Sequence, residues 1–171
     1  MVGLAGVPRA ANDAARGMGM TDRQRLFGVE FPLAFPVILT GIFSLPNRED
    51  DFYDVLYEQP AKLQQAGVRF CISTGDPGAE VRNLPLYAGM AAAFGLSKAD
   101  AVKAVTLYPA QILNVADRLG SIEVGKMANL VVTDGDLLET RSHIKYLFID
   151  GRPVVLTSRH TELNDAFKNR R

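Results

Sequence analysis

The sequence predicts an α/β fold, and three observations support this prediction. Two apolar runs, Phe35–Thr40 and Val68–Thr74, are predicted strands, and a segment of helical period, 52–66, separates them. A second helical segment follows the second run, so strands and helices alternate. From Gly120 onward the pattern changes to short apolar runs bounded by Gly and Asp. A block of strand-helix units followed by a block of strands indicates two parts, which meet near Asp117.

The first unit is predicted as strand, helix, strand. Pro36 lies at the start of the first strand, where a missing amide hydrogen is least costly. Both strands are apolar throughout, which is typical of strands covered on both faces. The intervening helix should end at Gly67, and Pro60 is expected to break or kink it. Because the links are short and a helix connects the strands, the two strands should be parallel.

Three further helices are expected after the second strand. Asn83 can cap the first of them, with Pro85 in its first turn. Ser97 with Asp100 three residues later resembles a capping box, which opens the second helix. The expected ranges are about 84–95, 98–107 and 109–115.

The predicted strands after Gly120 are Ala128–Thr133, Tyr146–Ile149 and Pro153–Leu156. Asp150-Gly151-Arg152 separates the last two, and Asp-Gly between two apolar runs is a strong hairpin signal. The polar tail, 159–171, should be a solvated helix or a frayed end.

Composition excludes several classes of function. Lys plus Arg and Asp plus Glu number 19 each, so no overall charge attracts nucleic acid or an anionic membrane surface. No apolar run approaches the roughly 20 residues that cross a bilayer, and the first residues do not form a secretory signal. We therefore expect a soluble chain, of unknown localisation, with no nucleic acid or membrane partner. The single Cys71 lies in an apolar strand, where a small buried side chain is expected.

Asp76 is the first candidate for a catalytic residue. It lies in Gly75-Asp76-Pro77-Gly78, directly after the second apolar run. A carboxylate just beyond the carboxyl end of a buried parallel strand lies where α/β folds, open sheets and barrels alike, place ligand and catalytic sites. Asp-Pro-Gly is also ordinary turn chemistry. From the local sequence, the catalytic and the plain-turn interpretations both stay open.

Several stretches carry a resemblance to a known family. The segments 106–113, 117–132 and 149–154 resemble the C-terminal part of metal-dependent amidohydrolases, with imidazolonepropionase-like proteins as the nearest subgroup. Ser73-Thr74-Gly75-Asp76, followed by Val81-Arg82-Asn83-Leu84-Pro85, resembles the end of the eighth barrel strand and the entry to the next helix. The first predicted strand then corresponds to the seventh.

This resemblance implies a fold and an activity. The chain would hold the last two strand-helix units of an incomplete (β/α)8 TIM-type barrel, followed by C-terminal β-sandwich strands. The corresponding division is an unassigned segment 1–34, a partial barrel 35–116, a sandwich part 117–157 and a tail 158–171. Family members hydrolyse non-peptide carbon–nitrogen bonds of small molecules, often cyclic amides, with a divalent metal for which zinc is the expected ion.

The resemblance also implies roles for two residues. Asp76 would bind metal and handle the proton of the attacking water. Many members place Asp directly after Thr, whereas Gly75 intervenes here, which could shift the carboxylate by one residue. Arg82, near the barrel mouth, could contact substrate, and its structural alternative is a surface arginine beside a helix start.

The histidine ligands of the family come from strands that this sequence does not contain. His143 and His160 are its only histidines, one before a sandwich-type strand and one in the tail, and both lie far in sequence from the C-terminal ends of the two predicted barrel strands, where ligands must converge. Catalytic divalent ions take about three protein ligands, which one Asp cannot replace. We therefore expect no tightly bound metal and no activity in this chain alone, while the amide substrate and the metal belong to a complete protein.

Three hypotheses stay open. The chain is the C-terminal part of an amidohydrolase, a non-catalytic interaction or assembly module derived from one, or an unrelated small α/β binding domain. In the first case, two strands of an unclosed barrel would expose edges and apolar surface. We expect such a chain to self-associate through exposed strand edges, to be partly unfolded or to depend on a partner.

Overall fold

The computed structural model describes residues 36–46, 50–75 and 80–168, together with Gly19, Thr21, Gly78 and Arg170. The unassigned segment 1–34 therefore lies almost wholly outside the described residues. Strand β1 (Val37–Leu39) pairs in parallel with β2 (Phe70–Ile72), and the register joins Val37 to Phe70. The predicted parallel pair is confirmed, with strands shorter than the apolar runs around them.

Helix α4 (Val55–Gln65) connects the two strands and corrects one expectation. Pro60 does not break it, because the helix continues through that residue for another turn. A proline inside a helix costs about 3 kcal/mol through its missing amide hydrogen and its ring. Here the ring is among the largest fully buried side chains, so burial of apolar surface offsets part of that cost. As predicted, the helix ends before Gly67, which has a φ of 69°.

Three helices follow β2 through the short 3-10 helix η3 (Val81–Asn83). They are α5 (Leu84–Ala93), α6 (Lys98–Val105) and α7 (Leu107–Ile112). The predicted cap at Ser97 is confirmed, since its hydroxyl oxygen accepts a hydrogen bond from the backbone N–H of Asp100 at 3.0 Å. The Asp100 carboxylate accepts from the Ser97 hydroxyl, at 2.7 Å. Asn83 occupies the N-cap of α5 without a capping hydrogen bond, because its side-chain amide donates to Glu80 instead, at 2.9 Å.

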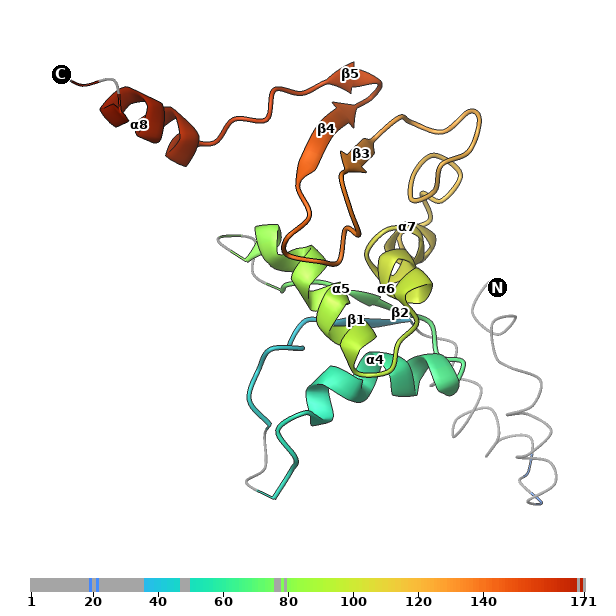
Figure 1. Cartoon of the computed structure of the whole chain (residues 1–171). Helices are drawn as coiled ribbons and strands as arrows, with labels where there is room; N and C mark the ends of the chain where they lie inside the picture. The colour runs from blue at the N-terminus through green and yellow to red at the C-terminus, as the bar shows by residue number, and fades with distance from the viewer. Residues whose placement is uncertain are drawn as a thin grey trace.

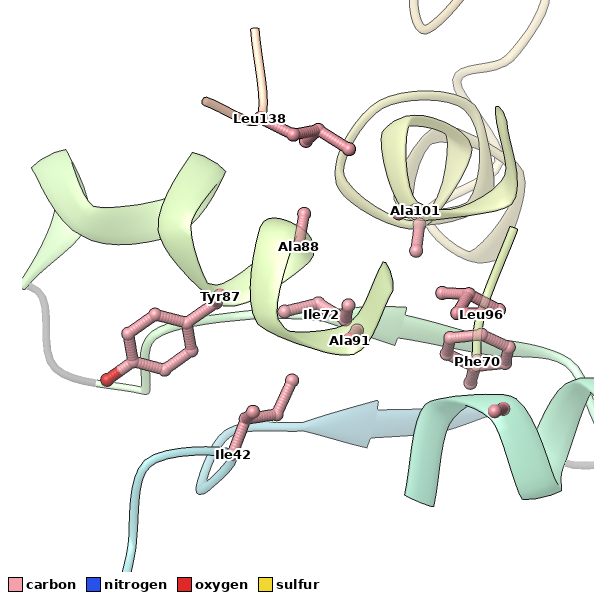
Figure 2. Packing of buried hydrophobic residues seen from close by; sticks show 11 residues of the cluster. Ile42, Phe70, Ile72, Tyr87, Ala88, Ala91, Leu96, Ala101 and Leu138 are labelled. Carbon is pink, nitrogen blue, oxygen red and sulfur yellow. The ribbon is translucent and has the colours of Figure 1, made fainter. Parts of the chain in front are cut away.

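The core is formed where α5 and α6 meet β2 (Figure 2). Phe70 and Ile72 of β2 are 1% and 3% exposed. The helices contribute mainly alanines, all fully buried, at positions 88, 91, 101 and 104. Small side chains allow helix backbones to approach the sheet closely, so this packing keeps β2 buried on the helix side.

A separate antiparallel sheet follows, in the order β3 (Leu130–Thr133), β4 (Ile144–Ile149) and β5 (Arg152–Pro153). The predicted hairpin is confirmed, because Asp150 and Gly151 both have positive φ, 51° and 74°, as its tight turn requires. The expected continuation of the last strand to Leu156 is wrong. After Pro153 one more hydrogen bond joins the chain to β4, from the Val154 N–H to the Leu147 carbonyl at 2.8 Å. The chain then turns, with the Thr157 N–H donating to the Val155 carbonyl at 3.0 Å.

The loop between β3 and β4 anchors this sheet to the helices. Leu138 in that loop is 8% exposed and belongs to the core cluster, near Ala88 and Ala101 in Figure 2. The loop backbone approaches α5 so closely that a Cβ on Gly89 would lie 2.8 Å from the Leu138 carbonyl oxygen. Lys98 adds two ion pairs to the loop, to Asp136 at 2.6 Å and Glu139 at 3.5 Å. The polar loop therefore holds the two parts of the chain together.

Helix α8 (Arg159–Lys168) ends the described chain and lies apart from the other elements (Figure 1). It has no buried residue, so the expectation of a solvated helix is confirmed. Among the described residues, no helix combines the length and the apolar character that crossing a membrane requires.

Candidate functional site at the carboxyl edge of the parallel strands

The candidate site lies where β1 and β2 end. Because the strands are parallel and in register, Thr40 and Ser73 follow them at the same edge of the pair. The Ser73 N–H donates to the Leu39 carbonyl at 2.8 Å, which extends the ladder by one bond. This edge is where parallel α/β sheets place polar groups that act on ligands.

Gly75 controls the direction in which the chain leaves this edge. Its φ is 77°, a left-handed conformation that residues with a Cβ rarely adopt. Its N–H donates to the Ser73 hydroxyl at 3.3 Å, and an added Cβ would lie 3.0 Å from the Cβ of Thr40. Gly75, which departs from the family pattern, is thus required by the local backbone.

Asp76, the predicted catalytic and metal-binding residue, lies outside the described residues, as do Pro77 and Ala79. What the structure gives is the turn that precedes it. The chain is described again from Glu80, a second carboxylate that the sequence interpretation did not single out. Glu80 accepts the Asn83 hydrogen bond, and it adds to burial in raising the pKa of Tyr87. Its spacing of three residues from Asn83, the predicted N-cap residue, was the available signal.

Arg82 lies in η3 and is exposed. It lines a groove of about 290 Å³ between the start of α5 and the β3–β4 loop, together with Leu86, Leu138 and Thr140. The structure therefore places Arg82 against the loop that anchors the second sheet. Its contact with a substrate stays a prediction.

Two open grooves flank the carboxyl edge. One, of about 310 Å³, runs from Thr40 along the chain that leads to α4. The other, of about 380 Å³, includes Ser73 and Thr74 and continues over Ile38 and Cys71. Cys71 is buried as predicted, and this burial raises the pKa of its thiol. Ile38 is 56% exposed, which agrees with the expectation that the two strands of this chain expose apolar surface.

The two histidines lie on other elements. His143 precedes β4 with its side chain 77% exposed, and its Nδ1 lies 3.3 Å from Asp134 Oδ2. The Asp134 carboxylate also accepts the backbone N–H of His143 and pairs with Lys145, and these contacts lower its pKa to about 2. His160 is exposed on α8. His143 is therefore part of a surface turn beside the second sheet.

The described residues contain no cluster suited to a metal ion. Nowhere in 36–46, 50–75 and 80–168 do three His, Cys, Asp or Glu side chains cluster. Because catalytic divalent ions take about three protein ligands, the described residues do not by themselves fit such an ion.

Solved structures resemble this chain over part of their length. An amidohydrolase from Thermotoga maritima is 27% identical with a TM-score of 0.63, covering 85% of this chain and 36% of its own. A second amidohydrolase is 26% identical, with a TM-score of 0.51, over 60% of this chain and 27% of its own. A Xaa-Pro dipeptidase with bound methionine, at 23% identity and a TM-score of 0.50, covers 58% of this chain and 25% of its own, and supports the fold alone. The chain thus spans about a third of its Thermotoga relative.

A curated protein also matches over a short stretch. The osmoprotectant import permease protein OsmY of Salmonella typhimurium is 55% identical over 40 residues, which is 23% of this chain and 17% of the permease. A match of this length assigns no family. A family model described as the amidohydrolase family, in contrast, matches residues 57–157, from α4 through the hairpin. Because that match covers more than half of the sequence, the chain belongs to the amidohydrolase family.

Proposed function

We propose that this chain is the C-terminal portion of a metal-dependent amidohydrolase that hydrolyses non-peptide carbon–nitrogen bonds. The substrate would be a small molecule, a cyclic amide or a related compound. The observation that carries the proposal is the family match over 57–157, in a chain whose parallel strand β2 is followed by Ser73-Thr74-Gly75-Asp76 at its carboxyl end. That edge is where such folds place their chemistry.

The proposed architecture follows the same resemblance. β1 and β2 would be the seventh and eighth strands of a (β/α)8 barrel, and β3, β4 and β5 would belong to a β-sandwich. Their parallel pairing through a helical connection supports this assignment. The subgroup we propose is the imidazolonepropionase-like one. The proposed division of the chain is an unassigned segment 1–34, a partial barrel 35–116, a sandwich part 117–157 and a tail 158–171.

Asp76 is the proposed catalytic residue, taking a proton from the attacking water, and Arg82 is the proposed substrate contact. The position of Asp76 in the sequence shortly after β2, at the carboxyl edge of the parallel pair, supports the first assignment. In the complete protein a divalent ion, with zinc expected, would be held by Asp76 together with residues that the described chain does not supply.

The test uses the complete Thermotoga maritima relative. We expect the residue of that protein aligned with Asp76 to be a carboxylate needed for turnover, so that its change to the amide lowers turnover about 10²- to 10⁴-fold, the usual contribution of a general acid-base group. The melting temperature should stay nearly unchanged. Retained turnover with a collapsed melting temperature would identify the position as a structural turn and overturn the assignment.

For this chain alone we predict no stoichiometric zinc, manganese or iron and no amide hydrolysis. The reason is that one carboxylate does not replace a set of about three ligands. Metal analysis after desalting, and hydrolysis assays against a matched Asp76→Asn variant, check this. One ion per chain that is lost in the variant, or hydrolysis above the variant, would show that the chain holds a working site.

A non-catalytic interaction module derived from an amidohydrolase is the alternative. The groove of about 380 Å³ beside β2 favours it, because its described lining is uncharged and its rim exposes Ile38, Val81 and Leu113. A soluble, cooperatively melting monomer would support an independent module over an incomplete barrel.

A further inference from the structure

The outer edge of β1 is a strand edge with no partner in the described part of the chain. There, β1 pairs with β2 alone. The Val37 N–H donates to the Arg69 carbonyl at 2.8 Å, and the Leu39 carbonyl accepts from the Ser73 N–H at 2.8 Å. Both β1 residues therefore point their backbone groups toward β2. Because this direction alternates along a strand, the N–H and the carbonyl of Ile38 point to the outer edge.

This outer edge is exposed and uncharged. Ile38 is 56% exposed, whereas Phe70 and Ile72 of β2 are buried. A groove of about 310 Å³ includes Ile38 and Thr40, and Leu45 on its rim is 86% exposed. No Lys, Arg, Asp or Glu is among the described residues that line this groove. Proteins usually protect a strand edge with charged side chains or a covering element, so this edge is suited to pairing with another strand.

The backbone groups of the edge are complementary to themselves. In a trans peptide the carbonyl and the N–H point in opposite directions. Since the Val37 N–H and the Leu39 carbonyl point to β2, the Pro36 carbonyl and the Thr40 N–H point outward, on either side of Ile38. In an antiparallel pair of two β1 strands centred on Ile38, each Ile38 donates to and accepts from its counterpart. Each Thr40 N–H then meets a Pro36 carbonyl, and Pro36 has no N–H that would lack an acceptor.

We propose that a second copy of this chain binds at this edge, with the two β1 strands antiparallel about a twofold axis at Ile38. The occupant is a second copy because donors on the edge match acceptors on the same edge. The uncharged lining of the groove also brings no like charges together across the axis. Pairing would join two two-stranded sheets into one, and a sheet of more than two strands is more stable than an isolated pair. The inference is independent of the proposed hydrolase activity.

The first test is cross-linking of the full 171-residue chain carrying Ile38→Cys, with a short bifunctional thiol reagent. Directly opposite residues of a hydrogen-bonded antiparallel pair have Cα atoms about 5.5 Å apart, so the two thiols lie within reach of the reagent. We expect most of this variant to become a covalent dimer. The unchanged chain should not cross-link, because its single cysteine, Cys71, is 5% exposed.

Leu113→Cys is the matched control for cross-linking. Leu113 is 69% exposed, but it lies on the rim of the groove beside β2 and not on β1. Random collisions between chains would therefore cross-link Leu113→Cys at least as fast as Ile38→Cys. We expect Leu113→Cys to react about tenfold more slowly or less, because only thiols held opposite each other have an effective concentration in the mM range.

A second test removes the hydrogen bond at the axis. Ile38→Pro deletes an N–H that points away from β2, an orientation in which an edge strand tolerates proline. We expect light scattering to give about twice 18.6 kDa for the unchanged chain and 18.6 kDa for Ile38→Pro. Ile38→Val, which keeps the N–H, should remain a dimer. Thermal melting shows whether Ile38→Pro folds, and Ile38→Lys, which places a charge on the edge, replaces it if it does not.

Three outcomes would overturn the proposal. The first is a monomeric or larger-than-dimeric mass for the unchanged chain, and a monomer would leave the edge to a strand of another protein. The second is Leu113→Cys cross-linking as fast as Ile38→Cys, which would place the contact beside β2. The third is a dimer that persists in folded Ile38→Pro or in Ile38→Lys.

Discussion

Gly75 gives a prediction at the scale of one residue. Gly75→Ala places a Cβ in a left-handed conformation, at about 1–2 kcal/mol, and brings it 3.0 Å from the Cβ of Thr40. Gly125→Ala is the matched control, because φ there is 91° and nothing lies within 4 Å of the added atom. We expect Gly75→Ala to lose about 1 kcal/mol more in urea unfolding than Gly125→Ala. Equal losses of unfolding free energy in the two variants would mean that Thr40 moves and relieves the contact.

Asp134 predicts a dependence of stability on pH. Its folded-state pKa of about 2 results first from the hydrogen bond of the His143 backbone N–H and then from Lys145. Because this pKa lies below the unfolded value of about 3.9, the carboxylate stabilises the fold above about pH 4, and this contribution is lost as the pH falls through 2. The unfolding free energies of the unchanged chain and Asp134→Asn should therefore differ at pH 5 and converge at pH 2. A difference that stays constant over this range would contradict the prediction.

At the scale of elements, the same cap occurs on a packed helix and on an exposed one. Ser97 accepts the Asp100 N–H at the start of α6, and Ser158 accepts the Thr161 N–H at 3.3 Å before α8. Replacing an N-cap serine by alanine costs about 1 kcal/mol of helix stability. Because α6 contributes to the core, Ser97→Ala should lower the global unfolding free energy by about 1 kcal/mol. Because α8 has no buried residue, Ser158→Ala should leave the global unfolding free energy unchanged. Equal effects in chemical denaturation would show that α8 unfolds with the rest.

Local chemistry decided which elements were predictable. The Asp150-Gly151 turn, the Ser97 cap and the end of α4 before Gly67 are each specified by a few neighbouring residues, and each is confirmed. That α4 continues past Pro60 was not predictable, because it depends on burial of the ring, which local sequence does not reveal. The last strand was overestimated because Val155 and Leu156 are apolar but remain exposed.

At the scale of the whole molecule, exposed apolar surface predicts self-association. Ile38 and Leu113, on the rim of the groove beside β2, are 56% and 69% exposed. Contiguous apolar patches of this kind usually mark contact surfaces. We expect size-exclusion chromatography with light scattering to give a mass above the 18.6 kDa of one chain, and the double variant Ile38→Lys/Leu113→Lys to lower it. Leu163→Lys on the solvated α8 is the control. A mass of 18.6 kDa for the unchanged chain would contradict the prediction.

The site was only partly accessible from sequence. Parallel pairing, which fixes the common edge of β1 and β2, follows from a helix that links two apolar runs. A cleft of about 240 Å³ beside the start of β2 was not foreseen, because Arg69 lies far in sequence from Tyr108 and Gln111 of α7 and the two segments meet only through packing. The anchoring of the β3–β4 loop was missed for the same reason, since Leu138 lies within a polar segment.

The close approach of that loop to α5 has a consequence for comparing relatives. An alanine at position 89 would require the Leu138 carbonyl to move, because 2.8 Å is shorter than any ordinary contact of a Cβ. Glycine at this helical position and the length of the β3–β4 loop should therefore co-vary. Homologues with a larger residue there should carry an insertion, a deletion or a different path in the loop, so that one position in an alignment reports how the second sheet is attached.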